Sequence, residues 1–264
     1  MKGLLPVLIH VLSISLIISQ DYPKKKFYKR GKHAAKIMGR DDRKYGDHSG
    51  NRVLCRFYNH GSIGDQSSSF SGVYPIGSGH SYIWEFSPVI AASVVDTNGF
   101  RRHIVSDGIS GLVDASPEGT PWSFEPLSGY SNPNQENLAM SDNENSWPNS
   151  WPNRTEDWNG EWNGQYGKYV RADQESYFVV DDSYNSEFEF WPDQNDIPED
   201  PTVSPDEHRR GLGIEMEARG YQWNHPAAED IIIVTYWITN VGSSVLDSVV
   251  FGMYGDADIG LSLI

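Results

Sequence analysis

The residues best placed for chemistry in this sequence are acidic pairs with short spacing. Asp256 and Asp258 stand two residues apart in a glycine-flanked stretch, residues 255–260. Carboxylate oxygens are the hard ligands that Ca²⁺ prefers, although the spacing here does not match an EF-hand loop. Asp256 and Asp258 are therefore candidate ligands of a structural calcium ion, with a solvated acidic turn as the alternative.

A second acidic pair could support hydrolysis. Glu215 and Glu217 alternate with apolar residues, so both carboxylates project from one face of a strand, about 7 Å apart. Glycosidases use carboxylates at such separations as acid and base. An amphipathic strand alternates in the same way without any catalysis, and this second interpretation is the one we favour.

Other catalytic patterns are missing from the sequence. Its 8 histidines form no HExxH pair, no G-x-S-x-G elbow occurs, and residues 77–80 read as a turn. Cys55, the only cysteine, lies in an apolar stretch and is interpreted as a buried side chain. We identify no catalytic and no cofactor-binding residue, and expect a protein that is not an enzyme.

Aromatic side chains offer a better case for binding. Four tryptophans lie in a stretch rich in Pro, Asn and Gly: Trp147, Trp151, Trp158 and Trp162. Flat aromatic rings can stack on pyranose rings, while neighbouring Asn, Asp and Glu side chains bind hydroxyl groups. These four tryptophans are therefore candidates for glycan stacking. The alternative is a lid that packs on one face of a sheet.

The elements that position these residues are strands. With 25 Gly, 15 Pro and 12% aromatic residues, the composition is typical of many short strands joined by turns. Strands are predicted at residues 52–58, 82–86, 89–95, 101–105, 177–180, 212–218, 231–238 and 249–254, with a hairpin turn at residues 96–99. The one helix candidate covers residues 33–38.

Two of these predictions concern the last third of the chain. Residues 231–238 are apolar on both faces, which predicts a central strand covered on both sides. A turn at residues 240–244 then predicts that the last three strands form a meander. The fold class we expect is all-β: an antiparallel β-sandwich, immunoglobulin-like or jelly-roll-like, with a long Trp/Asn/Pro-rich insertion.

The chain divides into five segments. Residues 1–19 have the positive start, apolar run and small-residue end of a secretory signal peptide, and the run is too short for a stable membrane span. Residues 20–47 form a basic flexible leader, since ten of the 21 basic residues lie between positions 24 and 44. A first β-rich part (48–116), a Trp-rich loop segment (117–170) and a β-sandwich part (171–264) follow, the last of which we expect to be truncated at Ile264.

Five stretches carry a resemblance to known proteins: residues 132–135 (NPNQ), 172–177 (ADQESY), 210–213 (RGLG), 229–243 (EDIIIVTYWITNVGS) and 249–260 (VVFGMYGDADIG). Together they resemble an uncharacterised group of large secreted proteins from Bacteroidetes-like and related marine or sediment bacteria. The resemblance implies immunoglobulin-like or fibronectin type III-like modules, followed by a C-terminal sorting domain for type IX secretion. This chain would correspond to the N-terminal part, and the resemblance implies no particular activity.

These observations lead to one expected function and two alternatives. We expect an exported, non-enzymatic fragment of a larger cell-surface or extracellular protein, with an adhesion or scaffold role. Its partners would be extracellular polysaccharide or cell-surface components. Nucleic acid is not expected as a partner, because the chain has a net charge of −15. The alternatives are a carbohydrate-binding or carbohydrate-active protein that uses the Trp-rich loop, and an accessory domain of an exported peptidase.

Overall fold

The structure is a computed structural model that describes residues 43–64, 70–110, 115–117, 119, 121–194, 197, 208–258 and 261–262. The signal segment 1–19, the leader up to residue 42 and the helix predicted at residues 33–38 lie outside the described residues. The elements are β1 (Tyr45–His48), β2 (Cys55–Tyr58), β3 (His80–Ser81), β4 (Glu85–Val95), β5 (Arg101–Asp107), β6 (Glu125–Pro126), β7 (Ala139–Met140), two 3₁₀ turns η2 (Glu144–Ser146) and η3 (Glu156–Trp158), β8 (Gln174–Asp181), β9 (Ile214–Gln222), β10 (Ile233–Asn240), β11 (Asp247–Asp256) and β12 (Leu261–Ser262).

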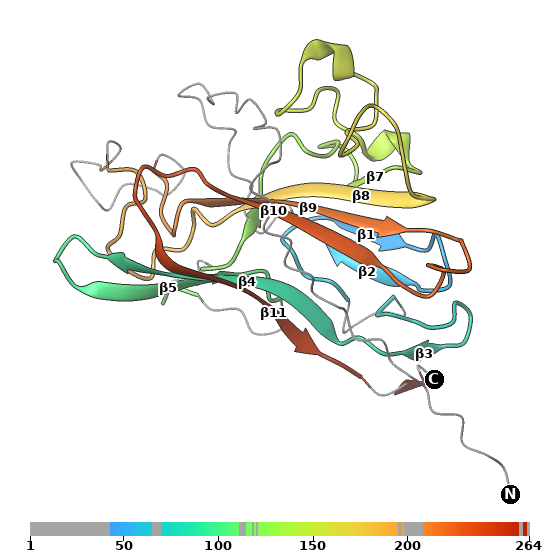
Figure 1. Cartoon of the computed structure of the whole chain (residues 1–264), viewed down its shortest axis with the longest axis horizontal. Coiled ribbons are helices and arrows are strands. Elements are labelled where there is room, and N and C mark those ends of the chain that lie inside the picture. Colours follow the sequence, from blue (N-terminus) through green and yellow to red (C-terminus); the bar gives the residue numbers. More distant parts are fainter. Residues whose placement is uncertain are drawn as a thin grey trace, which may run out of the picture. The chain divides into compact units, whose positions relative to one another are not determined.

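The strands form two facing layers (Figure 1). One sheet has the order β10-β9-β8-β6, with β7 also pairing with β8, and the other has the order β11-β4-β5. The β1–β2 pair adjoins the second sheet through bridges from Ile63 to Phe57 and to Phe86. All ladders between named strands are antiparallel. The predicted all-β, antiparallel sandwich is confirmed.

The main core lies between the two layers. Side chains alternate along each strand, so every second residue points inward. The inward-facing residues of the upper sheet in Figure 1 are Phe178 and Val180 of β8 and Ile214, Met216 and Ala218 of β9. They pack in one cluster with residues of the lower sheet: Ile90, Ala92 and Val94 of β4 and Ile104 of β5. The predicted half-buried character of residues 212–218 is confirmed, because Glu215 and Glu217 are only partly buried between buried neighbours.

The hairpin between β4 and β5 forms where the sequence predicts it. Gly99 adopts a φ of +80°, a left-handed conformation that costs little only for glycine. The Asp96 amide donates to the Phe100 carbonyl at 2.9 Å, and the Asp96 carboxylate accepts from the amides of Asn98 and Phe100. The Asp96 side chain therefore fixes the turn as an Asx-type connection.

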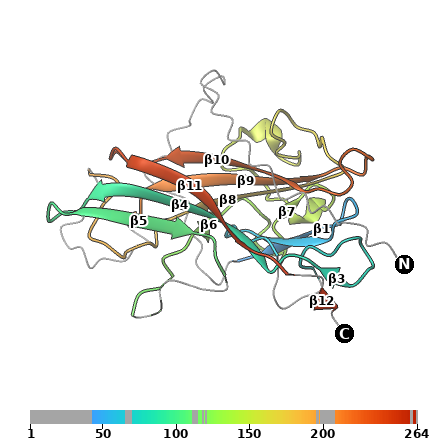
Figure 2. The same cartoon turned by 60° about the horizontal axis from the view of Figure 1, so that its bottom comes forward.

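Two predictions for the last third of the chain are wrong. Among the described residues β10 pairs with β9 alone, so it is an edge strand and not a central one. The returning strand, β11, pairs with β4 in the other layer, so no meander forms (Figure 2). The turn after β10 is present, with the Val241 amide bonded to the Gly213 carbonyl, but residues 241–246 carry the chain across from one sheet to the other.

The regular structure also begins earlier than expected. β1 starts at Tyr45, so residues 45–47 belong to a strand and not to the flexible leader predicted for residues 20–47. Arg56 on β2 holds the carboxylate of Asp47 on β1 in a two-point contact, at 2.7 and 2.9 Å. The buried amide side chains of Gln174 and Gln222 accept hydrogen bonds from the Gly50 amide, which ties the β1–β2 connection to β8 and β9.

Candidate ligand-binding surface

The Trp-rich segment folds onto the outer face of β8. Side chains on this face, Tyr177 and Val179, point away from the main core and form a second cluster with Trp151 and Trp162. The two indole rings meet edge to face, with centroids 6.0 Å apart. β8 is therefore covered on both faces, which agrees with the complete burial of its eight residues.

Hydrogen bonds show that two of the four candidate tryptophans are core residues. The Trp151 indole N–H donates to the Glu161 carbonyl at 3.0 Å, and that of Trp162 donates to the buried Glu175 carboxylate at 2.7 Å. Both rings are buried, 3% and 2% exposed. Neither ring is accessible for glycan stacking, so at these two positions the alternative interpretation of a packed lid is the right one.

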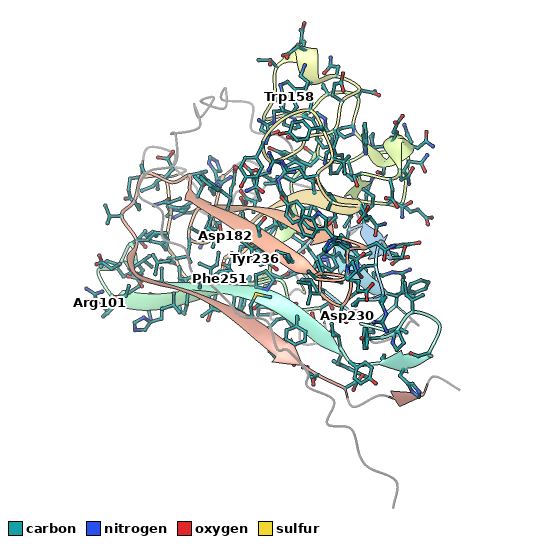
Figure 3. The ribbon with its side chains drawn as sticks, turned by 45° about the vertical axis from the view of Figure 1, so that its right-hand side comes forward. Arg101, Trp158, Asp182, Asp230, Tyr236 and Phe251 are labelled. Atoms are coloured by element: carbon teal, nitrogen blue, oxygen red, sulfur yellow. The ribbon has the colours of Figure 1, made fainter. Side chains whose placement is uncertain are left out.

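The other two candidates are only partly buried. The Trp147 indole N–H donates to the Met140 carbonyl at 2.7 Å, and its ring lies beside Trp162 with centroids 5.4 Å apart. Trp158 lies at the outer end of the insertion (Figure 3), where the Arg154 guanidinium sits 4.2 Å from its ring centroid. A stacked cation already occupies one face of this ring.

The exposed aromatic residues of the insertion follow the tryptophans. Tyr166 and Tyr169 are 52% and 50% exposed, and the Arg171 guanidinium lies over both rings, at 4.4 and 5.4 Å from their centroids. Arg171 also donates to the Tyr169 hydroxyl at 3.0 Å. These contacts hold two exposed rings next to one positive charge.

A fourth residue of this surface comes from the end of β9. Trp223 stacks on Tyr221 with an interplanar angle of 14°, and its indole N–H donates to the Arg171 carbonyl at 3.2 Å. Tyr221 in turn donates to the Gln165 side chain at 2.8 Å. Tyr166, Tyr169, Arg171 and Trp223 are named here the aromatic–arginine surface. Ring contacts and hydrogen bonds fix its geometry before any ligand arrives.

The sequence carried a signal for this surface that the prediction missed. Residues 165–171, QYGKYVR, place two tyrosines and two cations within seven positions directly after the tryptophans. Exposed Tyr, Trp and Arg are the residue types that dominate binding energy in protein interfaces. The tryptophans are more numerous in this stretch, whereas the exposed rings belong to Tyr166 and Tyr169.

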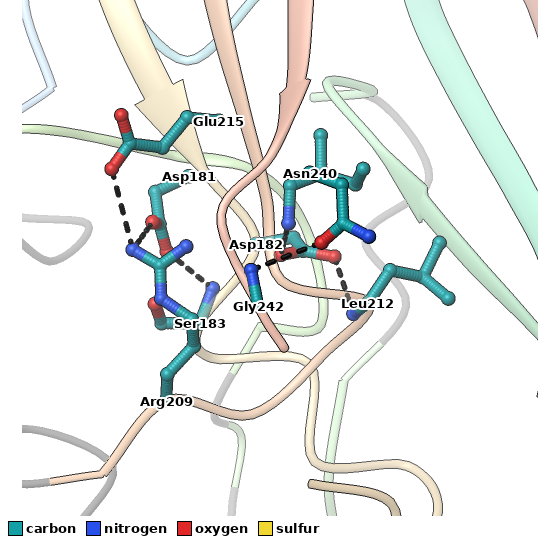
Figure 4. A network of polar contacts seen from close by, with 9 residues as sticks. Asp181, Asp182, Ser183, Arg209, Leu212, Glu215, Asn240 and Gly242 are labelled. Carbon is teal, nitrogen blue, oxygen red and sulfur yellow. Dashed lines mark hydrogen bonds and ion pairs between the residues drawn. The ribbon is translucent and has the colours of Figure 1, made fainter. Parts of the chain in front are cut away.

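A buried acidic network lies where β8 ends and β9 begins (Figure 4). The Asp182 carboxylate accepts hydrogen bonds from the amides of Leu212 (2.7 Å) and Ile214 (2.8 Å) and from the Ser106 hydroxyl (3.1 Å). Burial, with the neighbouring Asp181 charge as a smaller cause, raises the pKa of Asp182 to about 7. Three donors from two other segments give this carboxylate a structural role, joining both sheets.

The acidic pair on β9 is engaged in similar contacts. Arg209 forms ion pairs with Asp181 and, at 3.5 Å, with Glu215. The Tyr177 hydroxyl donates to Glu217 at 3.2 Å and accepts from Asn153. Each carboxylate thus belongs to a separate network, which fits the preferred interpretation of Glu215 and Glu217 as the polar face of a strand.

The calcium site predicted at Asp256 and Asp258 lies at the end of β11. Calcium binding there stays a prediction. Asp256 ends β11 and Asp258 follows it, with the Asp258 amide bonded to the Tyr82 carbonyl. In the part of the chain that the structure describes, no group of three or more His, Cys, Asp or Glu side chains could hold a metal. Because Ca²⁺ takes six to eight oxygens, an ion held by Asp256 and Asp258 would need further ligands such as backbone carbonyls or water.

The remaining sequence candidates are structural. Cys55 is buried, and burial raises the pKa of its thiol to about 12, as expected for a core cysteine. Ser78 lies in a turn and donates to the Tyr74 carbonyl, as predicted for residues 77–80.

No helix within the described ranges has the length and hydropathy needed to cross a bilayer.

The fold and this surface define a class of protein: an antiparallel β-sandwich that presents a fixed aromatic–arginine surface beside a packed insertion. In comparisons with known proteins, no family model, no curated protein and no solved structure matches the chain.

Proposed function

We propose that this chain is an exported, non-enzymatic β-sandwich module of a larger cell-surface or extracellular protein, with a role in adhesion. The observation that carries the proposal is the aromatic–arginine surface, in which Arg171 lies over the exposed rings of Tyr166 and Tyr169. A surface whose side chains are already fixed loses little conformational entropy when a ligand binds. Adhesion requires such a surface and no catalytic group.

The ligand class that this surface favours is extracellular polysaccharide. Planar rings offer flat apolar area to the C–H faces of a sugar, and tyrosine hydroxyls and the Arg171 guanidinium supply donors for hydroxyl or carboxylate groups. The neighbouring Trp223 extends the surface toward the end of β9. The expected carbohydrate-binding role thus rests on other residues than the four tryptophans named from the sequence.

Affinity electrophoresis of the purified protein through gels containing defined polysaccharides tests this proposal. We expect retardation in at least one gel, and a loss of affinity of about tenfold or more in the variants Tyr166→Ala and Tyr169→Ala. Phe100→Ala is the matched control, because Phe100 is 61% exposed and also lies beside an arginine, Arg102, at 5.4 Å. Equal mobility in all gels, or equal weakening by Phe100→Ala, would contradict the proposal.

The proposals of export and of type IX secretion come from the sequence alone. The signal-like segment 1–19 and the resemblance to large secreted bacterial proteins support them, and the single cysteine is compatible with an exported protein stabilised by its core. Expression with and without residues 1–19, followed by fractionation, tests export: the full chain should be found outside the cytoplasm and the shortened chain inside it.

A further inference from the structure

β10 has the sequence of a central strand and the position of an edge strand. Residues 231–246 include no charged residue and no proline. Within the described ranges β10 pairs with β9 alone, so one side of its backbone has no strand partner there. Natural edge strands are normally protected against pairing by charges, prolines, bulges or short length.

The other long edge strands carry such protection. β5 includes Arg101, Arg102 and Asp107 among its seven residues. β11 begins and ends with an aspartate, and its pairing with β4 is interrupted near Ser248, which has a φ of +52°. A bulge of this kind twists an edge away from further pairing. β10 is thus the unprotected edge among the three.

Exposed apolar side chains accompany this edge at both of its ends. Ile231 and Ile233 at its start, and Ile238 and Val241 at its end, are each between 36% and 41% exposed. At the same end a cleft of about 540 Å³ opens between β10 and the start of β11, lined partly by Ile238 and Val249. The exposed apolar area therefore continues from the strand into a hollow beside it.

We propose that β10 pairs with β10 of a second copy of this chain, antiparallel and about a two-fold axis, so that two sheets join into one. In this arrangement the isoleucines at the start of one β10 lie beside Ile238 and Val241 at the end of the other. A two-fold axis normal to the sheet also keeps inward-facing residues opposite inward-facing residues. β10 then occupies the central position for which its sequence is suited.

Charge favours a second copy over a charged partner strand. A basic or acidic strand would find no charged side chain to pair with along residues 231–246. Glu229 and Asp230, just before β10, contact Arg52 at 3.6 and 2.9 Å, and Asp230 marks this end of the strand in Figure 3. The antiparallel arrangement places this acidic pair beside the uncharged turn 240–244 of the second copy, away from its own counterpart.

Sedimentation velocity of the purified chain over the micromolar range tests this inference. We expect a dimer, which the variant Ile233→Lys converts to a monomer by raising the dissociation constant at least about tenfold. Val105→Lys is the matched control, because Val105 lies on β5 with 43% exposure, against 41% for Ile233. A monomeric wild-type chain, or equal dissociation by Val105→Lys, would overturn the proposal.

A second measurement removes the dependence on a destabilised variant. Thr235→Cys and Val105→Cys each place one new thiol on an edge strand, while the native thiol of Cys55 is buried. A short bis-maleimide should link Thr235→Cys into a covalent dimer and leave Val105→Cys monomeric. Absence of linked dimer in the folded Thr235→Cys variant would also overturn the proposal. Neither result depends on polysaccharide binding, so this inference and the proposed function can fail separately.

Discussion

Tyr236 of β10 and Phe251 of β11 face each other across the interior of the sandwich, with ring centroids 5.5 Å apart, although the two strands belong to different sheets (Figure 3). Both strands lie at sheet edges, so this ring pair closes one side of the main core. The Tyr236 hydroxyl is buried and makes no hydrogen bond to any described residue. A buried hydroxyl without a partner is destabilising, since it has lost its contacts with water.

Removal of this hydroxyl should therefore not destabilise the folded protein. For Tyr236→Phe we expect a free energy of unfolding that is unchanged or higher by up to about 1 kcal/mol. Tyr177→Phe should lower it by about 1–2 kcal/mol, because the Tyr177 hydroxyl bonds to Asn153 and Glu217. Urea unfolding of both variants measures the difference, and an equal loss in both would show that Tyr236 has a partner.

Two buried groups should give opposing dependences of stability on pH. Burial lowers the pKa of His48 to about 3, so the folded protein keeps this side chain neutral beside Ser176, 2.8 Å away. Its contribution is full above the ordinary pKa of about 6.5 and is lost as pH falls toward 3. The pKa of Asp182 is raised to about 7, so its contribution is full below about pH 4 and is lost as pH rises toward 7.

Between pH 4 and 6.5 these two effects should largely cancel, since each amounts to about 4–5 kcal/mol over its full range. We expect His48→Gln to lose stability with rising pH in this window, relative to the wild type, and Asp182→Asn to gain it. Chemical unfolding at several pH values measures both differences. Parallel profiles for the wild type and both variants would show that neither group titrates as described.

Two strand glycines should differ sharply in their tolerance of a methyl group. A Cβ on Gly220 would lie 2.6 Å from His48 Nε2 and 2.8 Å from Phe57, so Gly220→Ala should cost about 2–4 kcal/mol. A Cβ on Gly252 would meet nothing within 4 Å, and Gly252→Ala should be neutral or stabilising by about 0.5 kcal/mol. Thermal unfolding of the two variants checks this, and similar melting temperatures would contradict it.

The single thiol should report unfolding. Because Cys55 is buried and burial raises its pKa to about 12, we expect no reaction with a disulfide reagent at pH 8 in the native protein. Full reaction should follow in denaturant. Rapid labelling of the native protein at pH 8 would show that β2 opens independently of the rest of the sandwich.

The sequence predicts the strands well where the pattern is local. Alternation identified the buried face of β9, and Asp96 with Gly99 identified the β4–β5 hairpin. Pairing partners are not local: the turn after Asn240 has the composition of a hairpin turn, yet the chain continues past Leu246 and β11 pairs with β4. A strand that is apolar on both faces indicates that both faces are buried, but not which element covers them. For this reason the sequence of β10 predicts a central strand, whereas the structure has it at an edge.

The candidate site could be predicted only in part. Tryptophan suits a buried lid and an exposed stacking surface equally well, so Trp151 and Trp162 could not be assigned from their type. A buried tryptophan needs a hydrogen-bond acceptor for its indole N–H inside the protein. Here the acceptors are the carbonyl of Glu161 and the carboxylate of Glu175, and only the folded structure brings them to these two rings. Tyr166 and Tyr169 remain exposed because the rings before them already fill the outer face of β8.

The burial of β8 on both faces has a consequence for how the chain unfolds. Phe178 and Val180 belong to the cluster between the sheets, whereas Tyr177 and Val179 belong to the cluster under the insertion. Separation of either cluster from β8 would expose apolar side chains of the same strand. The insertion and the sandwich are therefore coupled in a single cooperative unit, and the amide protons of β8 should be the last to exchange with solvent.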